Sequence, residues 1–255
     1  ASLPQSATEA APVNINTDLG FATGVPVAYD YRRPTMFGFS GGGSTYGARG
    51  APIVMPVIGD WTVPPDYMPA YYDKATEKAS PGYYAVDLPT FHTKVELTAT
   101  QWTSLMRFTF PASHRSNVVL NLRRDGGDVE VVDDHTIRGV ATAGRRDRDT
   151  DGPYFIAEFS RPFTTFGTFR SEVTAKGEGL GREDVKAGRR RVSGDYAGAY
   201  VTYDTKAGDE VVVRIAHGHS AQEAEQRLRA QDSDADFDRV HAKARARWAE
   251  LFDRV

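Results

Sequence analysis

The sequence predicts a mostly β protein, a large antiparallel β-sandwich followed by one or two carboxyl-terminal helices. From Pro52 to about Ala216, apolar residues recur mostly at every second position, in runs of five to nine residues separated by Gly, Pro and Asp. This period is typical of strands with one buried face. No helical pattern lies between the runs, although the crossovers of a parallel sheet would need helices. After Ile215 the apolar residues recur at three- and four-residue steps, which indicates helices.

Two strands show the alternation most clearly. Polar and apolar residues alternate along Lys94–Ala99 and again along Thr103–Phe110, so one face of each strand is predicted to be buried. The other predicted strands are Gly82–Leu88, Asn117–Leu122, Val129–Val132, Thr136–Thr142, Tyr154–Phe159, Thr168–Ala175, Ala197–Tyr203 and Glu210–Ile215.

Two segments are predicted to lie outside the sheets. Residues 1–13 lack the charged and apolar regions of a signal peptide and are predicted to form a disordered tail. Lys176–Asp195 is rich in Gly, Arg, Lys and Glu and has no apolar period, so we predict an exposed excursion between strands. Within it, Arg189–Arg191 is interpreted as a solvated face rather than a phosphate site. The β-sandwich domain is therefore predicted over residues 14–219 and a helical segment over residues 220–255.

The carboxyl-terminal segment predicts two helices. Ser220 and Glu223 have the spacing of a capping box, and Ala221–Ala230 follows as a short helix. A second helix is predicted from about Asp236. Its apolar stripe consists of Phe237, Val240, His241, Ala244, Trp248, Leu251, Phe252 and Val255. Such a stripe packs either on the sandwich or on a following domain.

Composition excludes several classes of protein. The 255 residues allow one large β domain or two small ones, at about 150 residues per domain. Apolar residues make up 40% of the chain and charged residues 25%, which is enough to build a core. A net charge of −3 predicts no nucleic-acid partner. The longest mainly apolar run, Ala51–Ile58, is far shorter than the roughly 18 residues of a membrane span. The absence of cysteine excludes disulfides, thiolate metal sites and cysteine nucleophiles.

One segment matches the pattern of a calcium loop. Asp147, Asp149 and Asp151 alternate with other residues ahead of a glycine. Glu158 follows at the EF-hand spacing. Tyr154–Phe159, however, has strand-forming residues, and an extended strand would place Glu158 roughly 20 Å from Asp151. Two interpretations stay open, a bare turn or three aspartates that bind Ca²⁺ by themselves.

Histidines offer a second possible metal site. His217 and His219 follow the last predicted strand, and both imidazoles would lie on one side if the strand continued, as two metal ligands would. No third ligand is identifiable in the sequence. His92, His114 and His135 are isolated and are predicted to be surface residues.

A glycine-rich loop and nearby aromatic residues are the candidates for sugar binding. Gly42 and Gly43 belong to a run of three glycines with no helix after it, which indicates a flexible loop rather than a phosphate loop. Tyr46 and Trp61 lie near it in the sequence, and aromatic side chains on loops can stack on the face of a sugar ring. The alternative is that these aromatic residues belong to the sandwich core.

Several stretches occur in an order that resembles a known family. They are Tyr29–Tyr31 with Phe37–Ser40, Val54–Pro56, Ala79–Tyr84, Glu96–Thr100, Arg107–Pro111 and Tyr154–Ser160. In this order they resemble the amino-terminal β-sandwich domain of family 92 glycoside hydrolases, which are exo-acting bacterial α-mannosidases. Phe237–Val255 resembles the helical linker to the second domain of those enzymes. The resemblance covers roughly residues 14–255.

The resemblance implies that two domains contribute different parts of the active site. In the family, a helical (α/α)6 domain carries the calcium ion and the general acid and base of an inverting hydrolysis, and the sandwich lends loop residues to the rim of the mannose pocket. We therefore expect an accessory domain of a secreted or periplasmic bacterial enzyme, with its catalytic residues outside this chain. Its expected partners are the catalytic domain and a mannose-containing glycan. The candidate site residues are Gly42, Gly43, Tyr46 and Trp61 for the sugar, and Asp147, Asp149 and Asp151 for a metal ion.

Two other functions stay open at this point. The chain could be a free-standing carbohydrate-binding module that uses Tyr46, Trp61 and the neighbouring loops, or a purely structural domain that stabilises a partner. Aryl α-mannoside hydrolysis and sugar titration separate these hypotheses.

Overall fold

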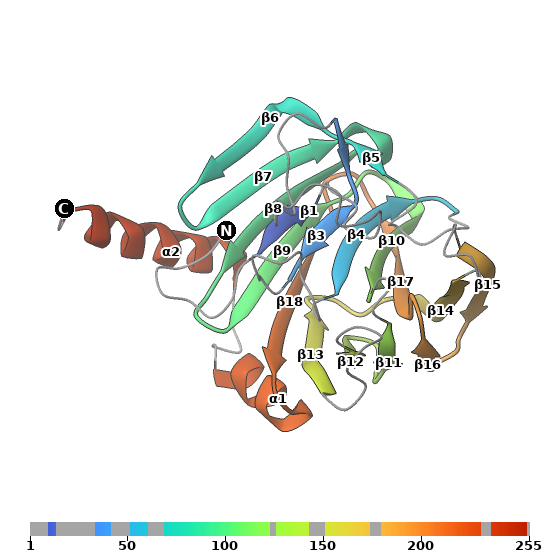
Figure 1. Cartoon of the computed structure of the whole chain (residues 1–255). Helices are drawn as coiled ribbons and strands as arrows, with labels where there is room; N and C mark the ends of the chain where they lie inside the picture. Colours follow the sequence, from blue (N-terminus) through green and yellow to red (C-terminus); the bar gives the residue numbers. More distant parts are fainter. Residues whose placement is uncertain are drawn as a thin grey trace, which may run out of the picture.

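The computed structural model consists of two antiparallel sheets packed face to face, with two helices at the carboxyl end (Figure 1). It describes residues 10–13, 34–41, 52–60, 69–122, 126–142, 151–173, 180–230 and 236–253. The predicted mostly β class, the antiparallel sandwich and the helices after it are confirmed.

One sheet has seven strands. In spatial order they are β1 (Ala11–Val13), β3 (Gly38–Ser40), β4 (Ile53–Ile58), β10 (Ser113–Asn121), β17 (Gly198–Thr205), β14 (Thr165–Val173) and β15 (Leu180–Ala187).

The other sheet has nine strands. Their order is β16 (Arg191–Gly194), β11 (Gly127–Val131), β12 (Thr136–Thr142), β13 (Asp151–Phe159), β18 (Glu210–Gly218), β9 (Thr103–Thr109), β8 (Thr93–Ala99), β7 (Tyr83–Leu88) and β6 (Asp73–Ser80). A small ladder pairs β2 (Thr35–Met36) with β5 (Ala70–Tyr71), and a 3-10 turn covers Pro89–Phe91.

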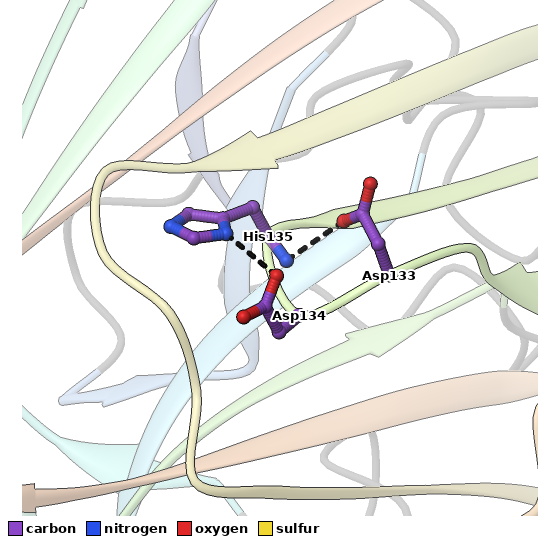
Figure 2. Close-up of side chains that lie close together, drawn as sticks. All are labelled: Asp133, Asp134 and His135. Carbon is purple, nitrogen blue, oxygen red and sulfur yellow. Dashed lines mark hydrogen bonds and ion pairs between the residues drawn. The ribbon is translucent and has the colours of Figure 1, made fainter.

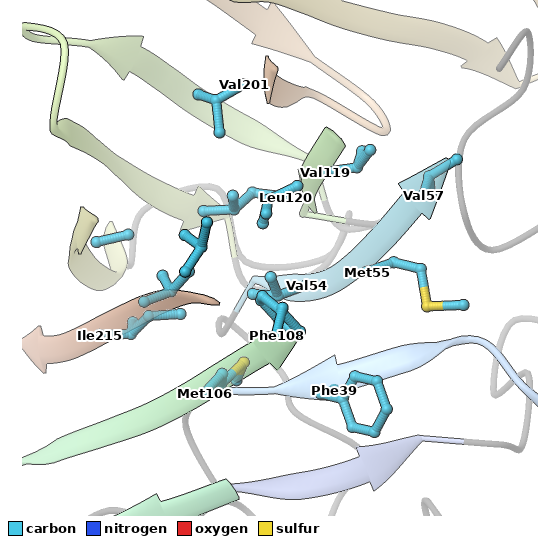
Figure 3. Close-up of a cluster of buried hydrophobic side chains, with 14 of the residues drawn as sticks. Phe39, Val54, Met55, Val57, Met106, Phe108, Val119, Leu120, Val201 and Ile215 are labelled. Carbon is cyan, nitrogen blue, oxygen red and sulfur yellow. The ribbon is translucent and has the colours of Figure 1, made fainter. Parts of the chain in front are cut away.

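The core lies between the two large sheets. Because successive side chains of a strand point to opposite faces, Met106 and Phe108 on β9 enter the core while Leu105 and Arg107 face outward. Figure 3 shows core side chains from both sheets, among them Leu120 of the seven-stranded sheet and Phe108 of the nine-stranded sheet. The alternation read from the sequence therefore separates core from outer face correctly.

Both predicted helices are present, α1 at Ala221–Ala230 and α2 at Phe237–Phe252. At the start of α1, the Ser220 hydroxyl accepts from the Glu223 backbone N–H at 3.1 Å, and Glu223 accepts from the His219 N–H at 2.7 Å. This reciprocal pattern confirms the predicted cap. At α2 the side chain of Asp236 accepts from the first backbone N–H groups, so the helix begins where the sequence predicted. No helix in the described part of the chain is long and apolar enough to cross a membrane.

Two predictions outside the sheets are wrong. Lys176–Asp195 contains strands β15 and β16 rather than an unstructured excursion. The predicted tail extends too far, because Ala11–Val13 pairs with β3 as strand β1, while residues 1–9 lie outside the described residues. Each of these three strands has a partner on one side only, so its sequence carries little sign of burial.

The arginine run at Arg189–Arg191 is solvated at Arg190 and Arg191, as the sequence indicated, while Arg189 is half-buried, and all three side chains are also engaged in hydrogen bonds or ion pairs. Arg189 donates to Thr168 and Asp184, and Arg190 donates to the carbonyl groups of Val131 and Val132 at the end of β11. Arg191 pairs with Glu130 of the neighbouring strand. The run therefore ties the β15–β16 connection to both sheets.

Candidate functional site

An open groove lies on the outer face of the nine-stranded sheet, beside the start of α2. Its volume is about 820 Å³. It is lined by Arg107, His135, Thr136, Glu158, Phe159, Ser160, Glu210, Val212, Arg214, Asp236, Phe237, Asp238 and Arg239. The groove thus brings together charged residues from β9, β13, β18 and α2.

Arg107 connects the sheet to α2. It lies opposite Glu96 in the β8–β9 ladder, and its Nε donates to Glu96 Oε2 at 2.9 Å. Its Nη1 donates to both carboxylate oxygens of Asp238, each at 3.0 Å. Tyr83 completes the cluster because its hydroxyl donates to Glu96 Oε1 at 2.6 Å. One guanidinium group therefore bridges a buried carboxylate on the sheet and an exposed one on the helix.

Electrostatics keep this cluster charged. Burial by itself would raise the pKa of Glu96, but hydrogen bonds from Arg107 and Tyr83 outweigh burial and hold that pKa below its usual value. Burial and the hydrogen bond to Glu96 raise the pKa of the Tyr83 hydroxyl. Glu96 is consequently an ionised acceptor at neutral pH and Tyr83 a neutral donor.

Apolar contacts hold the first half of α2 on the same face. Phe237 and Val240 form a small buried cluster with Leu105 of β9. The Arg107 guanidinium lies 4.3 Å from the Phe237 ring centroid, and the ring of Tyr83 stacks on His241 at 4.2 Å. The start of the helix is therefore fixed by packing as well as by charge.

A glycine permits α2 to approach the β6–β7 turn. Gly82 has φ +81°, and a Cβ atom built there would lie 2.9 Å from the Cβ of Ala244. Only glycine combines this backbone conformation with that contact. Ala244 is also the last buried residue of the helix.

Beyond Ala244 the helix leads away from the sandwich (Figure 1). Leu251 is 39% exposed and Phe252 is 58% exposed, and the Trp248 ring stacks on Phe252 at 5.6 Å. An apolar surface of this kind at the end of a helix is typical of a contact with another part of a protein.

The floor of the groove carries a second ion pair. Arg214 of β18 and Glu158 of β13 are opposite each other in the ladder, and their side chains pair at 2.5 Å. The extended strand predicted around Glu158 is confirmed, since it belongs to β13. Glu158 therefore forms an ion pair with Arg214 on the outer face of the sheet.

The predicted sugar-binding residues Gly42, Gly43, Tyr46 and Trp61 lie outside the described residues. Gly41, which precedes them, is described. Its carbonyl oxygen accepts from the Ser104 hydroxyl at 2.7 Å and from His217 Nε2 at 3.1 Å. The structure therefore fixes Gly41, the root of this loop, beside Ser104 of β9 and His217 of β18.

His217 acts as a hydrogen-bond donor to that root. Burial lowers the pKa of its imidazole to about 4, so the ring is neutral at pH 7. The backbone carbonyl of His217 also accepts from Arg227 of α1 at 2.7 Å. His217 and His219 belong to no group of three potential metal ligands within the described ranges.

The predicted calcium loop is not described at Asp147 and Asp149, and Asp151 opens strand β13 with no description of its side chain. The described residues bring one group of potential ligands together, Asp133, Asp134 and His135.

Figure 2 shows how these three side chains interact. Asp133 accepts from the His135 backbone N–H at 2.8 Å, and His135 Nδ1 lies 2.9 Å from Asp134. These contacts describe an Asx turn between β11 and β12. Two carboxylates and an imidazole do not fit calcium, which prefers six to eight oxygen ligands.

The sheet topology and the two helices define a two-sheet antiparallel β-sandwich domain with a helical extension at its carboxyl end. The sequence matches the profile of the glycosyl hydrolase family 92 N-terminal domain over residues 1–217. The chain therefore belongs to that family, and the resemblance seen in the sequence is confirmed. A comparison with curated proteins found no match.

Solved structures of the same family share the fold. An inverting family GH92 mannosidase, BT2199 from Bacteroides thetaiotaomicron, superimposes with a TM-score of 0.82 at 21% identity over 99% of this chain and 33% of that one. The GH92 α-mannosidase BT3965 from the same organism has a TM-score of 0.76 at 23% identity, over 98% of this chain and 35% of that one. The GH92 glycosyl hydrolase ccman5 has a TM-score of 0.72 at 20% identity, over 100% of this chain and 34% of that one. The chain thus spans about a third of the length of these relatives.

Proposed function

We propose that this chain is the accessory β-sandwich domain of an α-mannosidase-like glycoside hydrolase. In this role it docks a helical (α/α)6 catalytic domain and shapes the rim of a mannose-binding pocket. The observation that carries the proposal is the exposed apolar end of α2 at Leu251 and Phe252, in a chain that belongs to family 92. The mannosidases that it resembles are about three times as long, which supports a second domain in the working protein.

The anchoring of α2 explains how docking would work. Phe237, Val240 and Ala244 hold the first half of the helix on the sheet, and the Arg107 cluster adds an ionic contact. The second half then presents Trp248 and Phe252 in a fixed direction. Contacts that are ordered before association reduce the entropic cost of binding.

The rim of the pocket is assigned to the loop that starts at Gly41. Its root is held by Ser104 and His217, and Gly42, Gly43, Tyr46 and Trp61 follow or lie near it in the sequence. In this proposal the helical domain supplies the calcium ion and the two carboxyl groups that glycoside hydrolysis requires. The whole enzyme would be secreted or periplasmic in a bacterium.

Hydrolysis of an aryl α-mannoside tests the proposal. The chain alone is expected to show no turnover, and a mixture with a helical family 92 catalytic domain is expected to show turnover. Trp248→Ala should weaken that association, whereas Arg115→Ala, a change in an exposed residue of the seven-stranded sheet, should leave it unchanged. Turnover by the chain alone would contradict an accessory role.

Sugar titration separates the proposal from its two alternatives. Saturable binding of mannose by the chain alone, abolished by Trp61→Ala, would identify a free-standing carbohydrate-binding module. A purely structural domain would show no effect of Trp61→Ala on sugar affinity even in the mixture.

A further inference from the structure

A second groove lies on the outer face of the nine-stranded sheet, near its β16 edge. It has a volume of about 340 Å³ and is bounded by the outer faces of β11, β12, β13 and β16 and by the start of α1. This volume is at the lower end of the range for small-molecule sites, about 300–1,000 Å³. The groove lies apart from the Arg107 cluster, with which it shares no lining residue.

One side of the groove is a ladder of charged groups across three strands. Arg191 on β16, Glu130 on β11 and Arg138 on β12 are direct neighbours in register. Arg191 donates to Glu130 Oε1 at 2.6 and 3.0 Å, and Arg138 Nε donates to Glu130 Oε2 at 2.9 Å. These contacts use Nε and Nη2 of both arginines; Arg138 Nη1 lies 3.8 Å from Glu225 Oε1, and Arg191 Nη1 is not used in the contacts with Glu130. The ladder therefore holds planar N–H donors in fixed positions.

The other side of the groove is apolar. Val140 and Tyr154 are cross-strand neighbours on β12 and β13, and Tyr154 packs against the small cluster under α1 that includes Ile156. A half-buried aromatic ring beside an aliphatic side chain suits the C–H face of a sugar ring. The groove thus pairs an apolar wall with a row of hydrogen-bonding groups.

Charge decides which class of ligand fits. Arg138 and Arg191 are matched by Glu130, and Asp128 and Glu225 add two more carboxylates to the lining. The pKa of Glu130 is held low by hydrogen bonds from Arg191 and Arg138, so Glu130 is ionised. An anionic ligand would therefore meet three carboxylates beside two guanidinium groups, and a neutral polyhydroxyl ligand meets donors and acceptors in alternation.

We propose that this groove is a binding site for a neutral pyranose sugar, with the ring face on Val140 and Tyr154 and the hydroxyl groups on the Arg191–Glu130–Arg138 ladder. The site is separate from the pocket rim at the Gly41 loop and does not depend on the proposed function. The site would add a glycan contact near β16, one edge of the nine-stranded sheet; β6 forms the other edge.

Titration of the chain with methyl α-mannoside, methyl α-glucoside and glucuronate, followed by amide chemical shifts, tests this proposal. We expect saturable shifts of β11, β12 and β13 amides with a neutral methyl glycoside, at millimolar affinity, about −4 kcal/mol. Arg191→Gln should weaken binding about tenfold. Arg191 is 74% exposed on an edge strand, so this variant keeps the fold.

Arg247→Gln is the matched control, because Arg247 is an equally charged, exposed residue on α2 that pairs with Glu250. It should leave the affinity unchanged. The proposal is overturned if neither methyl glycoside shifts these strands, if the affinity survives Arg191→Gln, or if glucuronate binds more tightly than the neutral sugars. These outcomes leave mannoside hydrolysis with the helical domain untouched, so the two proposals fail separately.

Discussion

Removing Glu96 tests how firmly α2 is fixed to the sheet. Arg107 pairs with Glu96, with Asp238 and, at 3.8 Å, with Glu210; the Glu96 side chain is 6% exposed, whereas the Asp238 side chain is 72% exposed. Glu96→Ala leaves the Arg107 guanidinium, itself only 13% exposed, without its buried partner. Breaking a buried pair in this way costs about 3–5 kcal/mol of the free energy of unfolding.

Asp238→Ala removes an exposed partner of the same guanidinium. This pair is on the surface and is worth about 0–1 kcal/mol, to which the loss of an acidic residue in the first helical turn adds about 0.3–1 kcal/mol. Glu250→Ala, which breaks an exposed pair within α2, should cost less than about 0.5 kcal/mol and serves as a control.

Urea unfolding followed by circular dichroism measures all three variants. Glu96→Ala is expected to be far more destabilising than Asp238→Ala. Amide hydrogen exchange of α2 should also rise more in Glu96→Ala. Equal losses in the two variants, or a loss below about 1 kcal/mol for Glu96→Ala, would refute the assignment of the bridge to the buried pair.

Three further predictions concern other sites. His217→Gln should make the free energy of unfolding less dependent on pH between pH 7 and 5. The pKa of His217 is about 4 in the folded chain and 6.5 in the unfolded chain, so the unfolded chain binds the proton first as the pH falls. The parent protein therefore loses about 2 kcal/mol of its free energy of unfolding over this range. Urea unfolding at both pH values measures this, and equal slopes for parent and variant would argue against it. Gly82→Ala should be more destabilising than Gly208→Ala, since both have positive φ but only Gly82 would place a Cβ against α2; thermal unfolding compares them. Tyr203→Phe should be neutral or stabilising by about 1 kcal/mol, because the buried Tyr203 hydroxyl has no partner among the described residues, and a loss of stability would reveal one.

The sequence predicted most central strands of the two sheets and missed their edges, and it also missed β3 and β4 next to the β1 edge. β1 and β15 are the edges of the seven-stranded sheet, and β6 and β16 are the edges of the nine-stranded sheet. None of these four strands was predicted. Edge strands are open to solvent on one side and carry charged residues there, so the apolar period that marks a central strand is weak or missing.

The candidate site was less predictable than the fold. Alternation placed Glu96 and Arg107 on outward-facing positions of adjacent strands. Their third partner, Asp238, lies 131 residues further along the chain from Arg107. Which helix covers which strands depends on packing that no local pattern records. For the same reason His217 looked like a metal ligand in the sequence, although its ring donates to the carbonyl of Gly41.

The one-sided support of α2 has a mechanical consequence. Ala244 is the last buried residue of the helix, and Phe252 lies eight residues, about 12 Å, beyond it; within this stretch the half-buried Trp248 still lies beside Gly82. A tilt of about 10° at Ala244 would therefore displace the tip by about 2 Å, since the arm is about 12 Å long. Small changes where Ala244 meets Gly82 would therefore produce larger shifts of Leu251 and Phe252, the exposed apolar residues at the tip.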